Sequence, residues 1–205
     1  MARKTPLIPW LKVGVWIAAL LPLAILLYLL FTGGLTADDP VEEIQHRTGN
    51  AALILLLLTL SVTPLRRISG WNPLIRFRRL LGNFAFFYAS LHAFSYFVFD
   101  QQLSPSGIIA DVIEHPWVLL GFAAFVLLIP LAVTSTTGWI RRMGGKRWNR
   151  LHALIYPIAV LVVLHFLLQV KKDVSEPLTY AAFLGVIFGA RFLVRKGRKR
   201  VLANG

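Results

Sequence analysis

The sequence of 205 residues contains no cysteine. This absence excludes disulfides, cysteine-ligated iron–sulfur clusters, zinc knuckles and covalent haem attachment through a C-x-x-C-H motif. It does not indicate a compartment, because a chain without thiols tolerates either redox environment. Any metal that the protein holds must therefore be bound by other side chains.

Charged residues are also scarce. They make up 15% of the chain, against about 25% in soluble domains, while 57% of residues are hydrophobic and the mean hydropathy is +0.66. The formal charge of +13 is typical of nucleic-acid-binding proteins. Here, however, the basic residues lie between long apolar runs rather than along one exposed face. The composition therefore predicts an integral membrane protein in a lipid bilayer, with no nucleic-acid partner.

Six apolar stretches approach the length of about 20 residues that a membrane-spanning helix needs. They are residues 12–31, 49–65, 80–99, 117–137, 151–169 and 177–194. The first follows a basic start like that of a signal peptide, but its apolar run is longer, so we interpret it as a span. The second is short and can extend backward toward Gln45. We predict an all-α bundle of six transmembrane helices that forms one domain over residues 1–205.

The charges are divided between the two sides of this predicted bundle. Of the 22 basic residues, 19 fall on one side, and only Arg47, Lys171 and Lys172 fall on the other. All nine acidic residues fall with those three. The positive-inside rule therefore places both termini in the cytoplasm of a multi-pass membrane protein.

Acidic and basic residues are absent from the middle of every predicted span, so histidine is the remaining candidate for chemistry. His92 lies twelve residues past Leu80 and His165 fourteen past Leu151, or roughly 18 and 21 Å from the inner ends at 1.5 Å per residue. Two imidazoles at one depth can be opposing axial ligands of a non-covalent, b-type haem. The alternative is two separate histidines that form hydrogen bonds across helices.

His152 lies at the inner end of the same predicted helix as His165, thirteen residues earlier. On an ideal helix the two side chains are about 140° apart, although Pro157 between them can kink the helix. On the 80–99 helix the corresponding inner position holds Arg78 and Arg79, which do not ligate iron but suit a haem propionate or a flavin phosphate. His152 is therefore either a ligand with an unusual or absent partner, or an interfacial hydrogen-bonding residue.

The remaining histidines, an outer segment and the basic loops can each be explained by structure or topology as well as by function. His46 and His115 are solvated or capping residues of outer loops, although His46 also suits the edge of an outer quinone or haem. Residues 103–114 can form a short helix on the outer surface. The basic inner loops contain no G-x-G-x-x-G or P-loop motif. Any nicotinamide chemistry must therefore come from another protein.

The segments around these histidines resemble a known family. The similarity is carried by RRLLGNFAFFYASLHAFSY around His92 and by RWNRLHALIY ahead of His165, with GGLTADDPVEEIQHRTGNAAL, TPLRR, PLIRFRRLLG and LAVTSTTG in support. These segments resemble the ferric-reductase-like transmembrane domain. Within that superfamily they are most similar to the MsrQ (YedZ) family of haem-binding membrane subunits. The similarity covers essentially the whole chain.

The resemblance implies an electron-transfer protein of the bacterial inner membrane. Such a protein passes electrons from a cytoplasmic flavin reductase or the quinol pool to MsrP, a periplasmic molybdopterin methionine sulfoxide reductase that repairs oxidised proteins. It implies haem b, as one group or two, and FMN. His92, His152 and His165 match the family's haem-associated histidines. The chain departs from the four-histidine eukaryotic pattern at Arg78 and Arg79, and it lacks the FAD/NADPH domain of those enzymes.

These features predict an electron conduit with no substrate-reducing site of its own. One alternative is a cytochrome b-type quinol oxidoreductase that serves another periplasmic acceptor. Another is a transporter or scaffold without a cofactor.

Overall fold

The computed structural model describes residues 7–35, 39–170 and 172–203, with side chains as far as Val194. Arg3, Lys4, Asp38 and Lys171, which contribute to the charge count, lie outside these ranges. Within them the secondary structure is entirely helical, which confirms the predicted all-α class. The longer helices are α1 (Leu7–Thr32), α2 (Pro40–Ser69), α3 (Ile75–Ser95), α5 (Pro116–Val133), α8 (Ile155–Gln169) and α9 (Ser175–Ala203). The shorter ones are α4 (Pro105–Glu114), α6 (Thr137–Met143) and α7 (Gly145–Leu151), with 3₁₀ turns at Asn72–Leu74 and His152–Leu154 and a π-helix at Tyr96–Asp100.

Five helical segments of the described chain are long and apolar enough to cross a membrane. They are Leu7–Thr32, Pro40–Ser69, Pro116–Val133, Gly145–Gln169 and Ser175–Val194. The chain is therefore a multi-pass membrane protein. The predicted span 80–99 corresponds to α3 and the π-helix, which are not among the five because polar residues such as Arg79, Asn83 and His92 lower their hydropathy. A sixth span through α3 stays a prediction.

The second helix extends beyond Gln45 toward the N-terminus, as its short apolar run suggested. Asp39 caps it, since its side chain accepts a hydrogen bond of 2.8 Å from the backbone N–H of Val41. Pro40 occupies the first turn, where its missing N–H costs nothing. The helix ends at Gly70, whose φ of 68° favours glycine.

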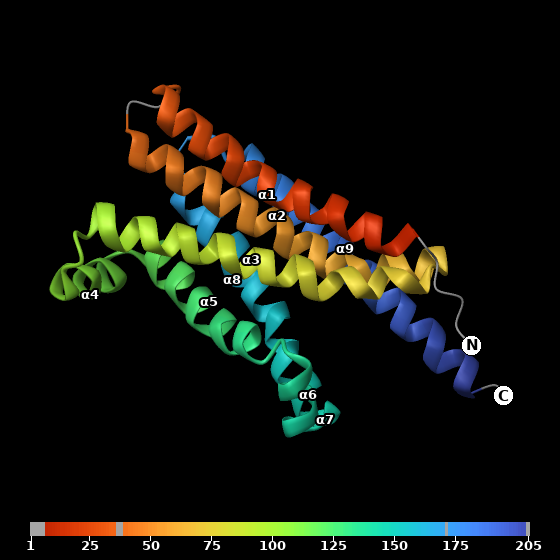
Figure 1. Cartoon of the computed structure of the whole chain (residues 1–205). Coiled ribbons are helices and arrows are strands. Elements are labelled where there is room, and N and C mark those ends of the chain that lie inside the picture. Colours follow the sequence, from red (N-terminus) through yellow and green to blue (C-terminus); the bar gives the residue numbers. More distant parts are fainter. Residues whose placement is uncertain (1–6, 36–38, 171, 204–205) are drawn as a thin grey trace.

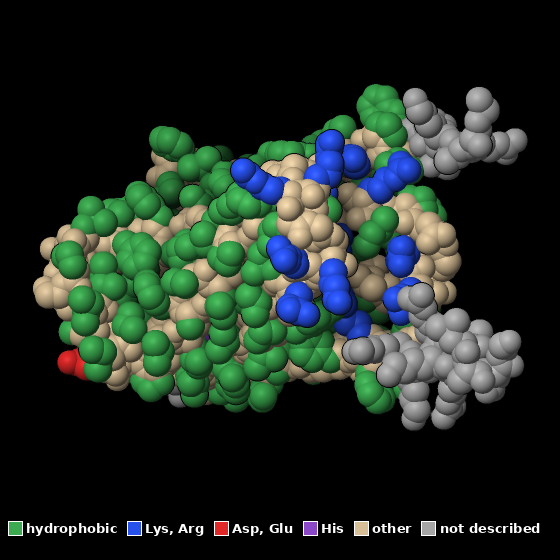
Figure 2. All heavy atoms as spheres, turned by 90° about the horizontal axis from the view of Figure 1, so that it is seen from below, with side chains coloured by type: hydrophobic (Ala, Val, Ile, Leu, Met, Phe, Trp, Pro, Cys, Tyr) green, Lys and Arg blue, Asp and Glu red, His purple; other side chains and the backbone are tan. Residues whose placement is uncertain are grey.

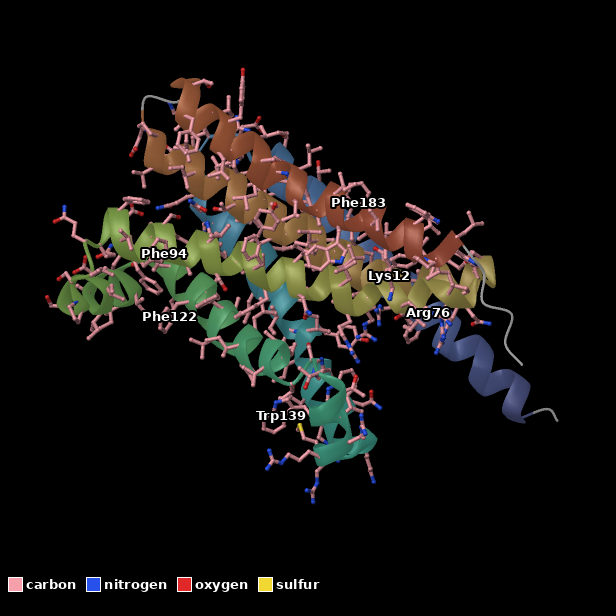
Figure 3. The ribbon with its side chains drawn as sticks, in the orientation of Figure 1. Lys12, Arg76, Phe94, Phe122, Trp139 and Phe183 are labelled. Carbon is pink, nitrogen blue, oxygen red and sulfur yellow. The ribbon has the colours of Figure 1, made fainter. Side chains whose placement is uncertain are left out.

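The helices form two groups that cross (Figure 1). Helices α2 and α3 pack along each other, with α1 and α9 against α2, while α5 pairs with α8. Helix α1 begins and α9 ends at the same end of the bundle (Figure 1). Figure 3 places Lys12 and Arg76 toward that end and Phe94 toward the opposite one.

The charge division predicted from the sequence is visible on the surface. Figure 2 shows the Lys and Arg side chains over one half of the visible face and an acidic side chain at the opposite end, with apolar surface between them. This apolar surface is the part of the protein that suits lipid.

Tyr88 of α3 is inserted into the backbone hydrogen-bond ladder of α1. Its hydroxyl accepts a hydrogen bond of 3.1 Å from the N–H of Leu23 and donates one of 2.7 Å to the carbonyl of Ala19. The adjacent Pro22 has no N–H and disturbs the ladder at this turn. The buried hydroxyl therefore forms hydrogen bonds with two backbone groups of α1, which lipid could not do, and it joins α1 to α3.

Arg191 of α9 has a similar role on α2. Its Nε and Nη2 atoms donate to the carbonyl of Leu60, at 3.2 and 2.6 Å, and Nη1 donates to the Tyr156 hydroxyl of α8. Pro64, four residues after Leu60, lacks the N–H that would normally bond this carbonyl. The half-buried guanidinium thus supplies the missing donor and holds three helices together.

Candidate functional site

His92 of α3 and His165 of α8 lie together, as their matched depth predicts. Their ring centroids are 6.1 Å apart and their planes are inclined by 75°. Both rings line one cavity of about 350 Å³. The structure therefore places two imidazoles, from helices far apart in sequence, at a single site.

Hydrogen bonds to backbone carbonyls fix the protonation of both rings. Nδ1 of His92 lies 3.0 Å from the carbonyl oxygen of Gln45, and Nδ1 of His165 lies 2.6 Å from that of Trp117. A carbonyl oxygen only accepts, so each Nδ1 carries the proton. In each neutral ring Nε2 then keeps a free lone pair, which is the form that ligates a metal.

Two glycines that the sequence interpretation did not single out allow this arrangement. A Cβ added at Gly49 would lie 3.3 Å from Nδ1 of His92, and one added at Gly121 would lie 2.8 Å from Nδ1 of His165. Each glycine follows by four residues the residue whose carbonyl accepts from that histidine. Because a helical Cβ tilts toward the N-terminus, a side chain at this position would cover that carbonyl. The i, i+4 spacing of Gln45–Gly49 and Trp117–Gly121 is the signal that could have identified them.

Small and apolar side chains line the rest of the cavity. The small ones are Ala52, Ala85, Ala89, Ala93 and Ala124, and the larger ones include Leu53, Leu56, Phe97, Phe122 and Phe125. The alanines come from α2, α3 and α5, where larger side chains would close the space. Stacked rings of Phe86 and Phe125 continue the aromatic surface of α3 that the sequence shows. The cavity volume lies within the range of small-molecule pockets, about 300–1,000 Å³.

The donor set fits a haem better than a bare metal ion. Across the described residues, no three His, Asp or Glu side chains converge as a metal site. Two histidines alone suit an iron that already has four equatorial ligands. With their ring centroids 6.1 Å apart, His92 and His165 are the two residues that would hold such a group.

Polar side chains of the π-helix and α4 meet along the wall of the cavity. Asp111 accepts hydrogen bonds from the Tyr96 hydroxyl at 2.5 Å and from Gln101 at 3.1 Å, and lies 2.7 Å from Nδ1 of His115. Asp100 accepts from the side chain of Gln45 at 2.5 Å. The short outer helix expected over residues 103–114 is thus present as α4, and it is tied to the end of the His92 helix.

His152 does not join the histidine pair. Its Nε2 lies 3.0 Å from the hydroxyl of Thr134, and its ring stacks on Trp148 at 3.9 Å between centroids. Arg78 lies near enough to interact with it electrostatically. Arg79 donates a hydrogen bond of 3.3 Å to Thr137. The geometry therefore favours the hydrogen-bonding role of His152, and a ligand role through Nε2 would require its bond to Thr134 to break.

His46 and His115 also have protein partners. His115 is paired with Asp111, and Nε2 of His46 lies 3.6 Å from a carboxylate oxygen of Glu176. Both residues are among those that line the cavity. The structure therefore assigns neither of them to the pair formed by His92 and His165.

Known proteins resemble this chain over its whole length. The family described as "Ferric reductase like transmembrane component" matches residues 48–163. A protein of Xanthomonas euvesicatoria is 45% identical over 209 residues, covering 100% of this chain and 95% of its own length. One of Rhodospirillum rubrum is 45% identical over 189 residues, covering 92% of this chain and 90% of its own.

Both of these relatives are described as "Protein-methionine-sulfoxide reductase heme-binding subunit MsrQ". No solved structure matches the chain. The matched region 48–163 contains Gly49, His92, Gly121 and His152, and the full-length relatives extend the similarity over His165. On these matches, the chain belongs to the MsrQ family within the ferric-reductase-like transmembrane proteins.

Proposed function

We propose that this protein is a haem b electron-transfer subunit of a methionine sulfoxide reductase system, with His92 and His165 as axial ligands. The observation that carries this proposal is the pair of imidazoles 6.1 Å apart, each with Nδ1 bonded to a carbonyl and Nε2 left as a donor to a metal. The names of the relatives support the same cofactor and system. When bound, the haem supplies a one-electron carrier.

The chain's own residues hold and tune this site. The carbonyls of Gln45 and Trp117 orient the two rings and raise the basicity of their Nε2 atoms. Gly49 and Gly121 let the rings approach those carbonyls. The apolar lining excludes water, which together with the axial ligands sets the reduction potential.

The proposed topology has six spans in one domain, with α3 as the additional span and both termini in the cytoplasm of the inner membrane. The positive-inside rule and the common end of α1 and α9 support it (Figure 1). In this orientation the pair formed by His92 and His165 lies in the outer half of the membrane, near a periplasmic acceptor. The acceptor that the family resemblance implies is MsrP, in the service of protein repair.

The electron donor that the resemblance implies is a cytoplasmic flavin reductase or membrane quinol. A bound FMN, and a second haem at His152, also rest on the resemblance. Arg78, which interacts electrostatically with His152, and the neighbouring Arg79 suit the anionic groups of either cofactor. The basic inner end of the protein suits a donor with an acidic docking surface.

Absorption spectroscopy of purified variants tests the haem assignment. We expect the wild type to show a reducible low-spin spectrum that His92→Ala and His165→Ala each abolish. His115→Ala is the matched control and keeps it, because His115 is bonded to Asp111. A folded but colourless wild type, or a ligand variant with an unchanged spectrum, would refute the pairing.

Co-expression with a periplasmic methionine sulfoxide reductase tests the system. We expect sulfoxide reduction in the periplasm to depend on this protein and to fail with His92→Ala. Reduction that proceeds equally without the protein contradicts the partner assignment.

A further inference from the structure

A second cavity of about 770 Å³ lies between α1 and α2, which we name the lateral cleft. Its α1 wall is wholly apolar and consists of Ala18, Leu21, Pro22 and Ile25. Its α2 wall consists of Glu42, Glu43, His46, Arg47 and Asn50, followed deeper in the membrane by Ala51 and Ile54. Leu21 and Ile25 are 54% and 43% exposed, so this edge of the cleft borders the lipid. The cleft therefore suits an amphipathic ligand with a polar head toward the outer surface and an apolar tail in the membrane.

The lateral cleft adjoins the cavity of the two histidines. Glu42, His46 and Asn50 line both spaces. On the same stretch of α2, Gly49 faces His92, since a Cβ added to it would lie 3.3 Å from Nδ1 of that ring. A ligand in the cleft is thus separated from the proposed haem site only by α2.

The polar wall favours a neutral head group. The charge of Arg47 is taken up by Glu43, whose carboxylate lies 2.6 Å from its Nη2 atom. The remaining carboxylate of Glu42 repels an anionic phosphate. His46 and Asn50 are both held by Glu176, at 3.6 and 2.9 Å, which fixes them at the junction of the two cavities. This wall offers hydrogen bonds and a proton acceptor but no free cation for a phosphate.

We propose that the lateral cleft binds the head group of a membrane quinol and that His46 accepts a proton from it. The proposal rests on the proposed function, in which quinol is one of the two donors. Oxidation of the quinol breaks its two O–H bonds and leaves the quinone. A haem held by His92 and His165 would accept the two electrons one at a time, with the first passed on to the sulfoxide reductase before the second is taken up. One proton passes to His46 and through Glu176 to the outer water, and the other passes to the carboxylate of Glu42.

Two alanine substitutions on α1 test the binding site. Ala18 and Ala24 are both exposed on α1, but only Ala18 lines the cleft. In nanodiscs, we expect Ala18→Trp to weaken the binding of decylubiquinone at least ten-fold, and Ala24→Trp to leave it unchanged. Haem content serves as the folding control in both. Equal quinone affinity of Ala18→Trp and the wild type overturns the proposal.

A photoreactive quinone tests the same site without depending on haem or on activity. We expect it to label peptides of α1 and α2, and excess decylubiquinone to displace the label. Displacement by phospholipid alone, or labelling confined to other helices, overturns the proposal. Because this readout does not require haem, it separates a wrong quinone site from a wrong haem assignment.

The role of His46 is tested with His46→Gln, which keeps a polar side chain of similar reach but cannot accept a proton. We expect quinone binding to stay within three-fold of the wild type and reduction by decylubiquinol to slow at least ten-fold. Reduction by dithionite is expected to be unchanged. A quinol-driven rate equal to that of the wild type overturns the proton transfer to His46.

Discussion

A comparison of Gly121→Ala with Gly49→Ala tests how strongly the geometry of the histidine pair depends on each glycine. The new Cβ at position 121 would lie 2.8 Å from Nδ1 of His165, whereas ordinary contacts begin at 3.4 Å. The His165 ring must therefore move by about 0.6 Å, because a close-packed interior leaves little room for the helix to yield. At position 49 the corresponding distance is 3.3 Å, so the ring of His92 needs to move by only about 0.1 Å.

This difference in displacement predicts a difference in haem affinity. The bond of His165 to Trp117 is short, at 2.6 Å, and a shift of that size stretches it beyond a good hydrogen bond. Loss of such an outer partner of a metal ligand typically lowers affinity about 10- to 100-fold, which we expect for Gly121→Ala. For Gly49→Ala we expect less than a ~3-fold change, since the bond to Gln45 persists.

Titration of the apoprotein with haem measures both affinities, and the low-spin spectrum reports the geometry. Alanine is a better helix former than glycine by about 1 kcal/mol, so a loss of haem cannot be attributed to a weaker helix. The reasoning is refuted if Gly121→Ala binds haem as tightly as the wild type, or if Gly49→Ala proves the more harmful of the two.

Substitutions at three further residues test other contacts. His152→Ala should lower the haem content only in part, as measured by the haem-to-protein ratio; a wild-type ratio would leave His152 only its hydrogen bond to Thr134. Tyr88→Phe removes the hydroxyl inserted into α1 and should destabilise the protein by about 1 kcal/mol in thermal unfolding, whereas no change would mean that α1 closes its own ladder. Arg191→Met should cost about 1–3 kcal/mol in the same assay and Arg191→Lys less, because lysine keeps one donor; equal stability of both variants and the wild type would refute the role of Arg191.

The spans were largely predictable because an apolar run of the right length is a local property of the sequence. The residues at which the helices begin and end were harder to predict from the sequence. The start of α2 depends on the Asp39 cap and Pro40, which lie outside the apolar run. The inner segment after Thr137 forms two short helices separated at Gly144, whose φ of 75° interrupts the helix, although the charges there suggest only a loop.

The meeting of the two central histidines was predictable from their matched distances along neighbouring helices, since the rise per residue sets those distances. The hydrogen-bond partners of these histidines were not predictable, because a backbone carbonyl is present at every residue and the sequence does not mark which one is used. The role of Arg191 was hidden for the same reason: its sequence position indicates a topology signal, while its contact is the carbonyl left free by Pro64.

The arrangement of glycines carries a consequence for which residues of this site can vary. His92 and His165 are each held by a neighbouring helix, through the carbonyl of Gln45 in α2 and that of Trp117 in α5. These acceptors belong to the backbone, so other side chains at positions 45 and 117 can present the same oxygen. Of the glycines four residues later, Gly121 cannot be replaced as freely, because a Cβ there would lie 2.8 Å from Nδ1 of His165, whereas a Cβ at Gly49 would lie 3.3 Å from Nδ1 of His92. The tautomer of each ring, and with it the free lone pair of Nε2, is therefore determined by two backbone carbonyls. Of the two contacts, the one between His165 and Trp117 is the more sensitive to a side chain at the following glycine.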